Sequence, residues 1–148
     1  RRRMSGRPIP FTRNAFPVLR TIPTRWMDVD TYGHVNNVIY LSFFDTAVNA
    51  WLIENGALDP RTSETVFLVV ETRCSYFSEL VFPDDVTAGI RVARLGGSSV
   101  TYEIALFRGE AEEASAQGSF VHVLVDAKTR RSVPIDEARR SLLASITV

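Results

Sequence analysis

The sequence predicts a single α+β domain in which an antiparallel sheet wraps around one long, buried helix. The helical stretch over residues 38–53 has only four polar positions, which are Ser42, Asp45, Thr46 and Asn49. Four long β-type runs follow it and are joined by short turns, which is the order of an antiparallel meander and not of βαβ units. The length of 148 residues corresponds to one domain.

The chain before the helix supplies a first strand and a loop. Residues 19–27 have the character of a short strand, and Pro23 within it indicates an edge position or a bulge because proline cannot donate to the ladder. Residues 28–33 form a loop by their aspartate and glycine content. We expect residues 1–16 to be a flexible basic tail and residues 17–148 to be the domain.

The long helix has recognisable ends. Asn36 or Asn37 offers an N-cap, and the helix runs to about Glu54, before Asn55 and Gly56. At 1.5 Å per residue it is about 27 Å long. Apolar residues on nearly every side predict a helix that is covered on nearly every side, as a wrapped sheet would do.

The remaining elements are strands and one short helix. Alternating or β-branched runs predict strands over residues 66–77, 86–93, 100–106 and 114–126. Turn residues separate these runs at 83–85, 96–97 and 108–110. Residues 136–144 predict a short terminal helix.

Composition excludes several classes of protein. The single cysteine, Cys74, excludes an intramolecular disulfide framework and a cysteine zinc site, and it fits a reducing compartment, so we expect a cytoplasmic protein. No apolar run approaches the ~20 residues that span a bilayer. Residues 1–13 carry five arginines and no acid, but no apolar signal core follows them. We interpret them as a passive terminus and expect neither nucleic acid nor membrane as a partner.

The segment over residues 28–37 is chemically dense, and two interpretations of it fail. A calcium loop needs oxygen ligands where Tyr32 and Ile39 stand. The Asp-x-Asp loop of haloacid-dehalogenase-type phosphatases needs a parallel sheet and a basic partner for the phosphate, whereas the only lysine, Lys128, lies near the far end.

A metal site is a third interpretation of the same segment. Asp28, Asp30 and His34 offer three ligands, but no residue at the expected spacing completes the shell. We therefore expect no metal.

The pattern Asp-x-Asp-x-x-Gly-His-Val-Asn-Asn-x-x-Tyr, followed by a buried helix, resembles the hotdog-fold acyl-CoA thioesterases of the 4-hydroxybenzoyl-CoA thioesterase class. The resemblance covers about residues 17–145 and includes the segments 95–99 and 131–134. It implies the hotdog fold and hydrolysis of an acyl-CoA thioester to the free acid and coenzyme A, without a cofactor.

The resemblance also implies roles for three residues of the motif. Asp30 corresponds to the carboxylate that acts as general base or nucleophile. The backbone N–H of Asn37, at the start of the helix, polarises the thioester carbonyl. His34 is either a catalytic helper or a residue that fixes the loop. Plant-type acyl-carrier-protein thioesterases have an asparagine where this chain has Tyr32, so their full set of catalytic residues is incomplete here.

Substrate-binding residues are expected in two places. Tyr40 on the helix suits an apolar or aromatic acyl group, although it suits the core equally well. Arg94, Ser98 and Ser99 surround the hairpin that lies near the nucleotide end of coenzyme A in the resembled family, and arginine suits phosphate.

Three further reactive residues have structural explanations. Some hotdog thioesterases carry their acid on the helix, where this chain has Asp45, but we favour a pairing role at a subunit contact for that residue. Cys74 is interpreted as an inert thiol within a strand, and His122 as a structural histidine in the last strand.

A single hotdog domain has open sheet edges and half a substrate groove, so the resemblance implies a homodimer with a continuous sheet, or a homotetramer. Two other functions stay open: a hotdog enoyl-thioester hydratase or dehydratase, and a non-catalytic acyl-binding protein.

Overall fold

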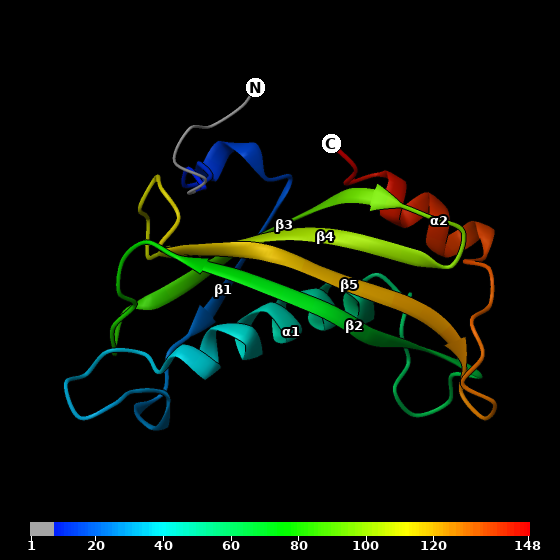
Figure 1. Cartoon of the computed structure of the whole chain (residues 1–148), viewed down its shortest axis with the longest axis horizontal. Coiled ribbons are helices and arrows are strands. Elements are labelled where there is room, and N and C mark those ends of the chain that lie inside the picture. Colours follow the sequence, from blue (N-terminus) through cyan, green and yellow to red (C-terminus); the bar gives the residue numbers. More distant parts are fainter. Residues whose placement is uncertain (1–7) are drawn as a thin grey trace.

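A computed structural model describes residues 8–148 and shows a five-stranded antiparallel sheet curved over one long helix (Figure 1). The elements are η1 (Arg13–Ala15), β1 (Val18–Pro23), η2 (Trp26–Asp28), α1 (Asn37–Glu54), β2 (Thr65–Tyr76), β3 (Asp85–Leu95), β4 (Ser99–Arg108), β5 (Ala116–Asp126) and α2 (Glu137–Ala144). The strand order is β1-β3-β4-β5-β2, which leaves β1 and β2 at the two edges of the sheet. The predicted hotdog architecture is confirmed.

Helix α1 begins and ends as the sequence predicts. The side chain of Asn36 accepts the N–H of Val38 at 3.4 Å, and Gly56 just beyond the helix has a φ of +74°. Its buried residues are Tyr40, Phe43, Phe44, Ala47, Val48, Trp51 and Leu52. Val38 and Ile53 are exposed, however, so a single chain leaves one flank of this apolar helix uncovered.

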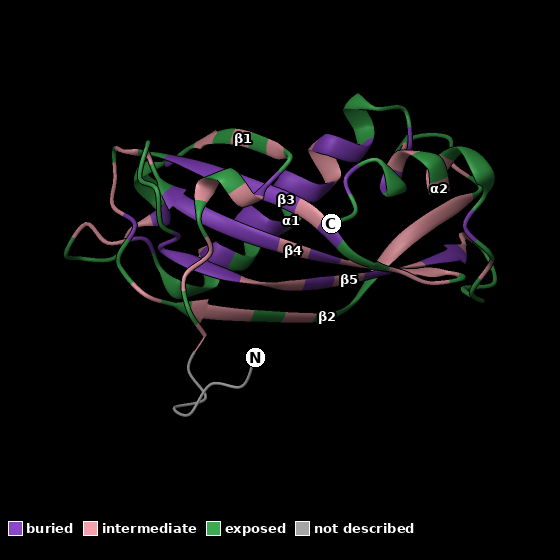
Figure 2. Cartoon of the chain, turned by 90° about the horizontal axis from the view of Figure 1, so that it is seen from above, coloured by how far each residue is buried: buried purple, intermediate pink, exposed green. Residues whose placement is uncertain are grey.

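The sheet is buried in its centre and open at the β2 edge (Figure 2). The strands β3, β4 and β5 carry most of the fully buried side chains, whereas the residues of β2 are half-buried or exposed. Val69 and Val70 of β2 are among the exposed large apolar residues. No helix within residues 8–148 has the length and apolar character to cross a membrane.

The first strand is shorter than predicted. It ends at Pro23 instead of reaching Met27, and residues 26–28 form the turn η2. The side chain of Asp28 accepts the backbone N–H of Arg25 at 2.8 Å, and this bond closes the turn. A carboxylate that caps its own turn therefore ends the strand.

The segment before β1 packs on the outer face of the sheet, which corrects the expected domain start at residue 17. Phe16 is 6% exposed and contacts Phe107 of β4 edge to face, with a centroid distance of 6.1 Å. The N–H of Phe11 donates to Gln117 Oε1 of β5 at 2.6 Å. These residues lack a periodic pattern, so nothing in the sequence marked them as packed. Residues 1–7 of the expected tail lie outside the described part.

Candidate active site

The loop between η2 and α1 is built on Asp28, which is 1% exposed. Asp28 Oδ1 accepts Nε and Nη2 of Arg25 at 3.1 and 2.8 Å, and this pairing raises the pKa of the guanidinium. The carbonyl of Asp28 accepts the N–H of Asn36 at 2.8 Å. With its carboxylate enclosed in this way, Asp28 is a structural residue.

Asp30, two residues later, is exposed. Its Oδ1 accepts the N–H groups of Tyr32 and His34 at 2.8 and 3.1 Å, and its own N–H donates to the carbonyl of His34 at 2.9 Å. Gly33, with a φ of +81°, turns the chain between them. Within residues 8–148, Oδ2 of Asp30 has no hydrogen-bond partner, so the carboxylate is held by one oxygen and presents the other.

The start of α1 offers a donor beside this loop. The side chain and carbonyl of Asn36 accept the N–H groups of Val38 and Ile39. The N–H of Asn37 has no acceptor in the described part of the chain, as expected for the first residue of a helix. A free N–H at the positive end of the helix can stabilise a developing oxyanion.

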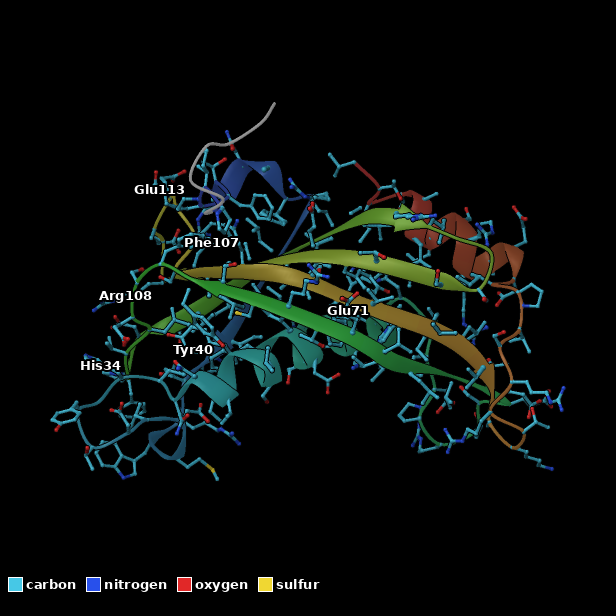
Figure 3. The ribbon with its side chains drawn as sticks, in the orientation of Figure 1. His34, Tyr40, Glu71, Phe107, Arg108 and Glu113 are labelled. Carbon is cyan, nitrogen blue, oxygen red and sulfur yellow. The ribbon has the colours of Figure 1, made fainter. Side chains whose placement is uncertain are left out.

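A second loop, over residues 77–84, lies against the first. The N–H of Val35 donates to the carbonyl of Leu80 at 2.8 Å, and the N–H of Leu80 donates to Tyr40 Oη at 3.1 Å. These bonds bring Glu79 next to His34, with 3.5 Å between Oε2 and Nδ1. Figure 3 shows His34 and Tyr40 at the same end of the molecule, where α1 begins.

A hollow of about 240 Å³ opens between this loop, α1 and β2. It is lined by Asn37, Tyr40, Tyr76, Phe77, Ser78 and Glu79. The rings of Tyr40 and Tyr76 meet edge to face at 5.0 Å, and burial raises the pKa of Tyr40 and brings that of Tyr76 to about 12. Both phenols are therefore protonated at neutral pH.

The structure brings together only some of the predicted residues. Asp30, His34, Asn37 and Tyr40 share the end of the molecule where α1 begins. Tyr76, Ser78 and Glu79 were not predicted from the sequence, because no motif around them indicates a place at the site.

The other predicted substrate residues lie at the opposite end of the sheet (Figure 1). Arg94, Ser98 and Ser99 stand at the β3–β4 hairpin, where Ser98 lines a shallow hollow with residues 132–134. The hairpin carbonyls of Gly96 and Gly97 accept Nη2 of Arg140 on α2. One chain therefore does not bring these residues to Asp30.

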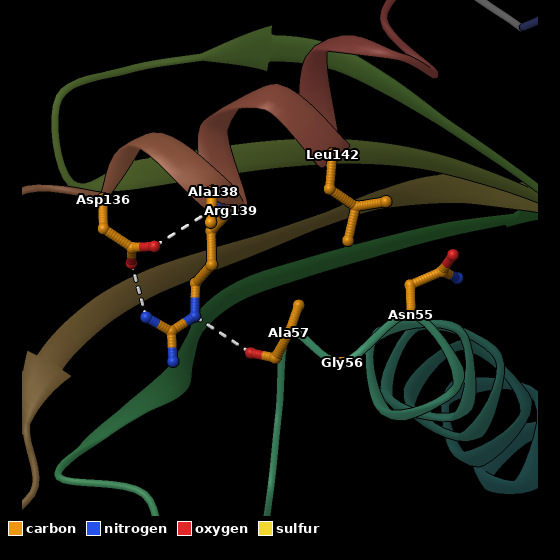
Figure 4. Close-up of a pocket in the computed structure, with 7 residues that line it drawn as sticks. All are labelled: Asn55, Gly56, Ala57, Asp136, Ala138, Arg139 and Leu142. Carbon is orange, nitrogen blue, oxygen red and sulfur yellow. Dashed lines mark hydrogen bonds and ion pairs between the residues drawn. The ribbon is translucent and has the colours of Figure 1, made fainter.

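A cavity of about 250 Å³ between α2 and the C-terminal end of α1 also lies at this opposite end (Figure 4). Arg139 crosses it, with Nε donating to the carbonyl of Ala57 at 2.9 Å and Nη1 donating to Asp136. Through these bonds Arg139 joins α2 to the segment that follows α1. Because its guanidinium is already engaged, the described residues around this cavity offer no free catalytic group.

None of the three remaining reactive residues lines the hollow, although Cys74 lies within hydrogen-bond reach of Tyr76. Asp45 is exposed on α1 and accepts Asn49 Nδ2 at 3.0 Å. Cys74 is half-buried, and burial raises the pKa of its thiol, which disfavours the reactive thiolate. His122 is buried in the core. Across residues 8–148, no cluster of three His, Cys, Asp or Glu side chains has an arrangement that could hold a metal ion.

Comparisons with known proteins agree with the hotdog fold. Residues 24–143 match the thioesterase-like superfamily. The structure resembles that of the PA5185 protein of Pseudomonas aeruginosa, with a TM-score of 0.91 and 48% identity over 94% of this chain and 97% of that chain.

Two further relatives have thioesterase names. A thioesterase of Thermus thermophilus, solved in complex with coenzyme A and Zn, has a TM-score of 0.71 and 27% identity over 89% of this chain and 95% of that chain. The long-chain acyl-CoA thioesterase FadM of Escherichia coli is 25% identical over 123 residues, which are 82% of this chain and 93% of FadM.

Proposed function

Because this chain belongs to the thioesterase-like superfamily, we propose that it hydrolyses an acyl-CoA thioester to the free acid and coenzyme A where α1 begins. One observation carries the proposal to this place. Asp30 in the loop has a carboxylate oxygen, and Asn37 at the start of α1 has a backbone N–H, that find no partner within residues 8–148, and the two residues flank His34 in the sequence. This is the pair of groups that attack on a thioester carbonyl requires.

In the proposed reaction Asp30 activates water. The carboxylate takes a proton from water while the water oxygen bonds to the carbonyl carbon, and the carbonyl oxygen, now negative, meets the N–H of Asn37. The C–S bond then breaks, and coenzyme A leaves as a thiolate that receives the proton from Asp30. In the other route, Asp30 itself attacks the carbon, and the C–S bond breaks to release coenzyme A as a thiolate. Water then cleaves the resulting anhydride to the free acid and the Asp30 carboxylate, and the proton released goes to the thiolate.

Tyr40 and Tyr76 give the hollow the aromatic wall that an acyl group would contact. The names of FadM and of the coenzyme A-bound relative support acyl-CoA as the substrate class. We place the nucleotide end of coenzyme A at Arg94, Ser98 and Ser99, which requires these residues to come from a second subunit.

The proposed assembly is a homodimer joined through β2, or a tetramer of such dimers. Within residues 8–148 no strand pairs with the outer edge of this 12-residue strand, and its Val69 is 46% exposed. A two-fold axis across β2 would run the paired strands antiparallel. In this arrangement the β3–β4 hairpin of one protomer lies toward the end of the partner at which the partner's helix α1 begins.

Replacing Asp30 tests the proposed function directly. Asp30→Asn keeps the shape and removes the charge, so we expect turnover of acyl-CoA substrates to fall by about 10²–10⁴-fold, the range for a general base. The melting temperature should not change because the side chain is exposed. Steady-state hydrolysis over a panel of acyl chain lengths measures the effect.

Two matched variants and one extra substrate complete the experiment. Asp28→Asn should lower the melting temperature because Asp28 is buried and paired, and Asp45→Asn should change neither quantity. Full activity in Asp30→Asn together with loss in Asp45→Asn would move the base to the helix. Hydration of an enoyl thioester without hydrolysis would identify a hydratase, and binding without turnover would identify an acyl-binding protein.

A further inference from the structure

His34 has an acidic neighbour that no sequence motif indicates. Glu79 comes from a loop 45 residues further along the chain, and its Oε2 lies 3.5 Å from His34 Nδ1. The backbones of the two loops are joined on both sides of this contact. The N–H of Val35 donates to the carbonyl of Leu80, and the N–H of Phe82 donates to the carbonyl of Gly33 at 3.3 Å. The approach of the two side chains is therefore set by the fold.

From this contact we propose that Glu79 is a positioning residue of the candidate active site and acts through His34. In this role its carboxylate accepts the Nδ1 proton of the neutral imidazole and leaves the lone pair of Nε2 for water or substrate. Which nitrogen of a histidine carries the proton is set by the partner of the other nitrogen. The role in turnover rests on the proposed thioesterase function, whereas the effect on the imidazole does not.

The other charged and titratable groups around this end are either carboxylates with partners of their own or phenols. Asp28 is paired with Arg25, and Asp84 with Arg108 at 2.7 Å. The phenol groups at this end are Tyr32, Tyr40 and Tyr76, and Oη of Tyr40 accepts from Leu80. Asp30 holds the backbone N–H of His34. Within residues 8–148, Glu79 is thus the carboxylate that pairs with the imidazole.

The imidazole can be observed without any substrate, because the chain has only two histidines and the second, His122, is buried. Correlation spectra of ¹⁵N-labelled protein at pH 8 report which ring nitrogen carries the proton. We expect His34 to be protonated on Nδ1 and to move toward the Nε2-protonated form, which free histidine prefers, in Glu79→Ala. Glu110→Ala, which removes an exposed carboxylate in the β4–β5 turn, should leave the spectrum unchanged. An unchanged His34 spectrum in Glu79→Ala would overturn the proposal.

Kinetics then test the role in turnover. Glu79→Ala should lower kcat about 10-fold with little change in KM, because a misplaced group weakens the chemical step and not binding. Glu79→Gln, which keeps an acceptor oxygen, should recover most of this loss. In the His34→Ala background, Glu79→Ala should cost nothing more, because the two residues act as one unit.

The two proposals fail in different ways. A wild-type protein without hydrolase activity contradicts the proposed function, while the spectra still decide the tautomer. Normal hydrolysis with full kcat in Glu79→Ala contradicts only the positioning role.

Discussion

At the scale of single residues, burial separates groups of identical chemistry. Asp28 and Asp30 are two residues apart, yet one is enclosed by Arg25 and the other is exposed with a free oxygen. The two histidines differ in the same way. His34 faces Glu79 at the surface, whereas His122 is 1% exposed. Neighbours and solvent access, and not residue type, decide which of each pair can take part in chemistry.

His122 makes folding stability sensitive to acid. It stacks on Phe67 at 5.1 Å and contacts Tyr102 and Phe120, and its Nδ1 has no partner in the described structure. Burial lowers its pKa to about 4, below the value of about 6.5 for an unfolded histidine. Between these values the unfolded chain binds the proton more readily, so the free energy of unfolding falls as the pH drops through this window.

The size of this effect is testable. The shift corresponds to up to about 3 kcal/mol lost between pH 7 and pH 4. Urea unfolding of the wild type and of His122→Phe at several pH values isolates the contribution of His122. The acidic residues contribute equally to the pH dependence of the two proteins, so their effect cancels in the comparison. The variant should lose less stability in acid. Parallel curves for the two proteins would show that His122 is not the sensitive group.

At the scale of elements, the segment before β1 is part of the folded domain. The guanidinium of Arg91 lies 4.5 Å from the ring centroid of Phe11 and 4.7 Å from that of Phe16. Arg13 donates to the carbonyls of Gly109 and Ala111 in the β4–β5 turn. Aromatic, cationic and hydrogen-bond contacts together fasten this segment to the outer face of the sheet.

Truncation measures what the segment contributes. Deleting residues 1–16 removes the cover of Phe107, and we expect the free energy of unfolding to fall by about 2 kcal/mol or more, the value of one buried aromatic side chain. Deleting residues 1–7 is the matched control because it keeps all of these contacts. Denaturant unfolding of both truncated chains gives the answer, and equal stability of the two would contradict the packing role.

At the scale of the whole molecule, several of the exposed apolar side chains lie on the edge strand β2 and on helix α1. Val69 and Val70 lie on the free strand β2, and Val38, Leu41 and Ile53 lie on the neighbouring helix α1. An apolar flank beside an unpaired strand edge favours association with another chain.

Two lysines on β2 test the proposed dimer. The wild type should have a mass of at least twice 16.6 kDa by light scattering. Val69→Lys with Val70→Lys should shift it toward the monomer, because charge on an edge strand opposes pairing. Val148→Lys, at the exposed end of the chain, is the control. A monomeric wild type at micromolar concentration would contradict the assembly, and activity in that monomer would show that one chain suffices.

Local pattern alone predicted most of the elements. The helix α1 agrees to within a residue, and the four long strands begin and end within two residues of the expected positions. Alternation, apolar periodicity and capping residues are properties of residues near one another in the sequence, so they can be recognised without knowing the fold. The motif around Asp30, His34 and Asn37 is local for the same reason, and the structure keeps its members in one loop.

The remaining features depend on residues that are distant in the sequence. Burial of Asp28, packing of residues 8–16 on the sheet, the bulge after Val69 and the approach of Glu79 to His34 all result from tertiary contacts. The free energy of each contact depends on the surface that the fold removes from water and on the groups that it brings within a few ångströms of one another. The sequence by itself therefore determined the elements and the loop of the candidate active site. Only the tertiary structure decided which carboxylate is free and which second carboxylate meets the histidine.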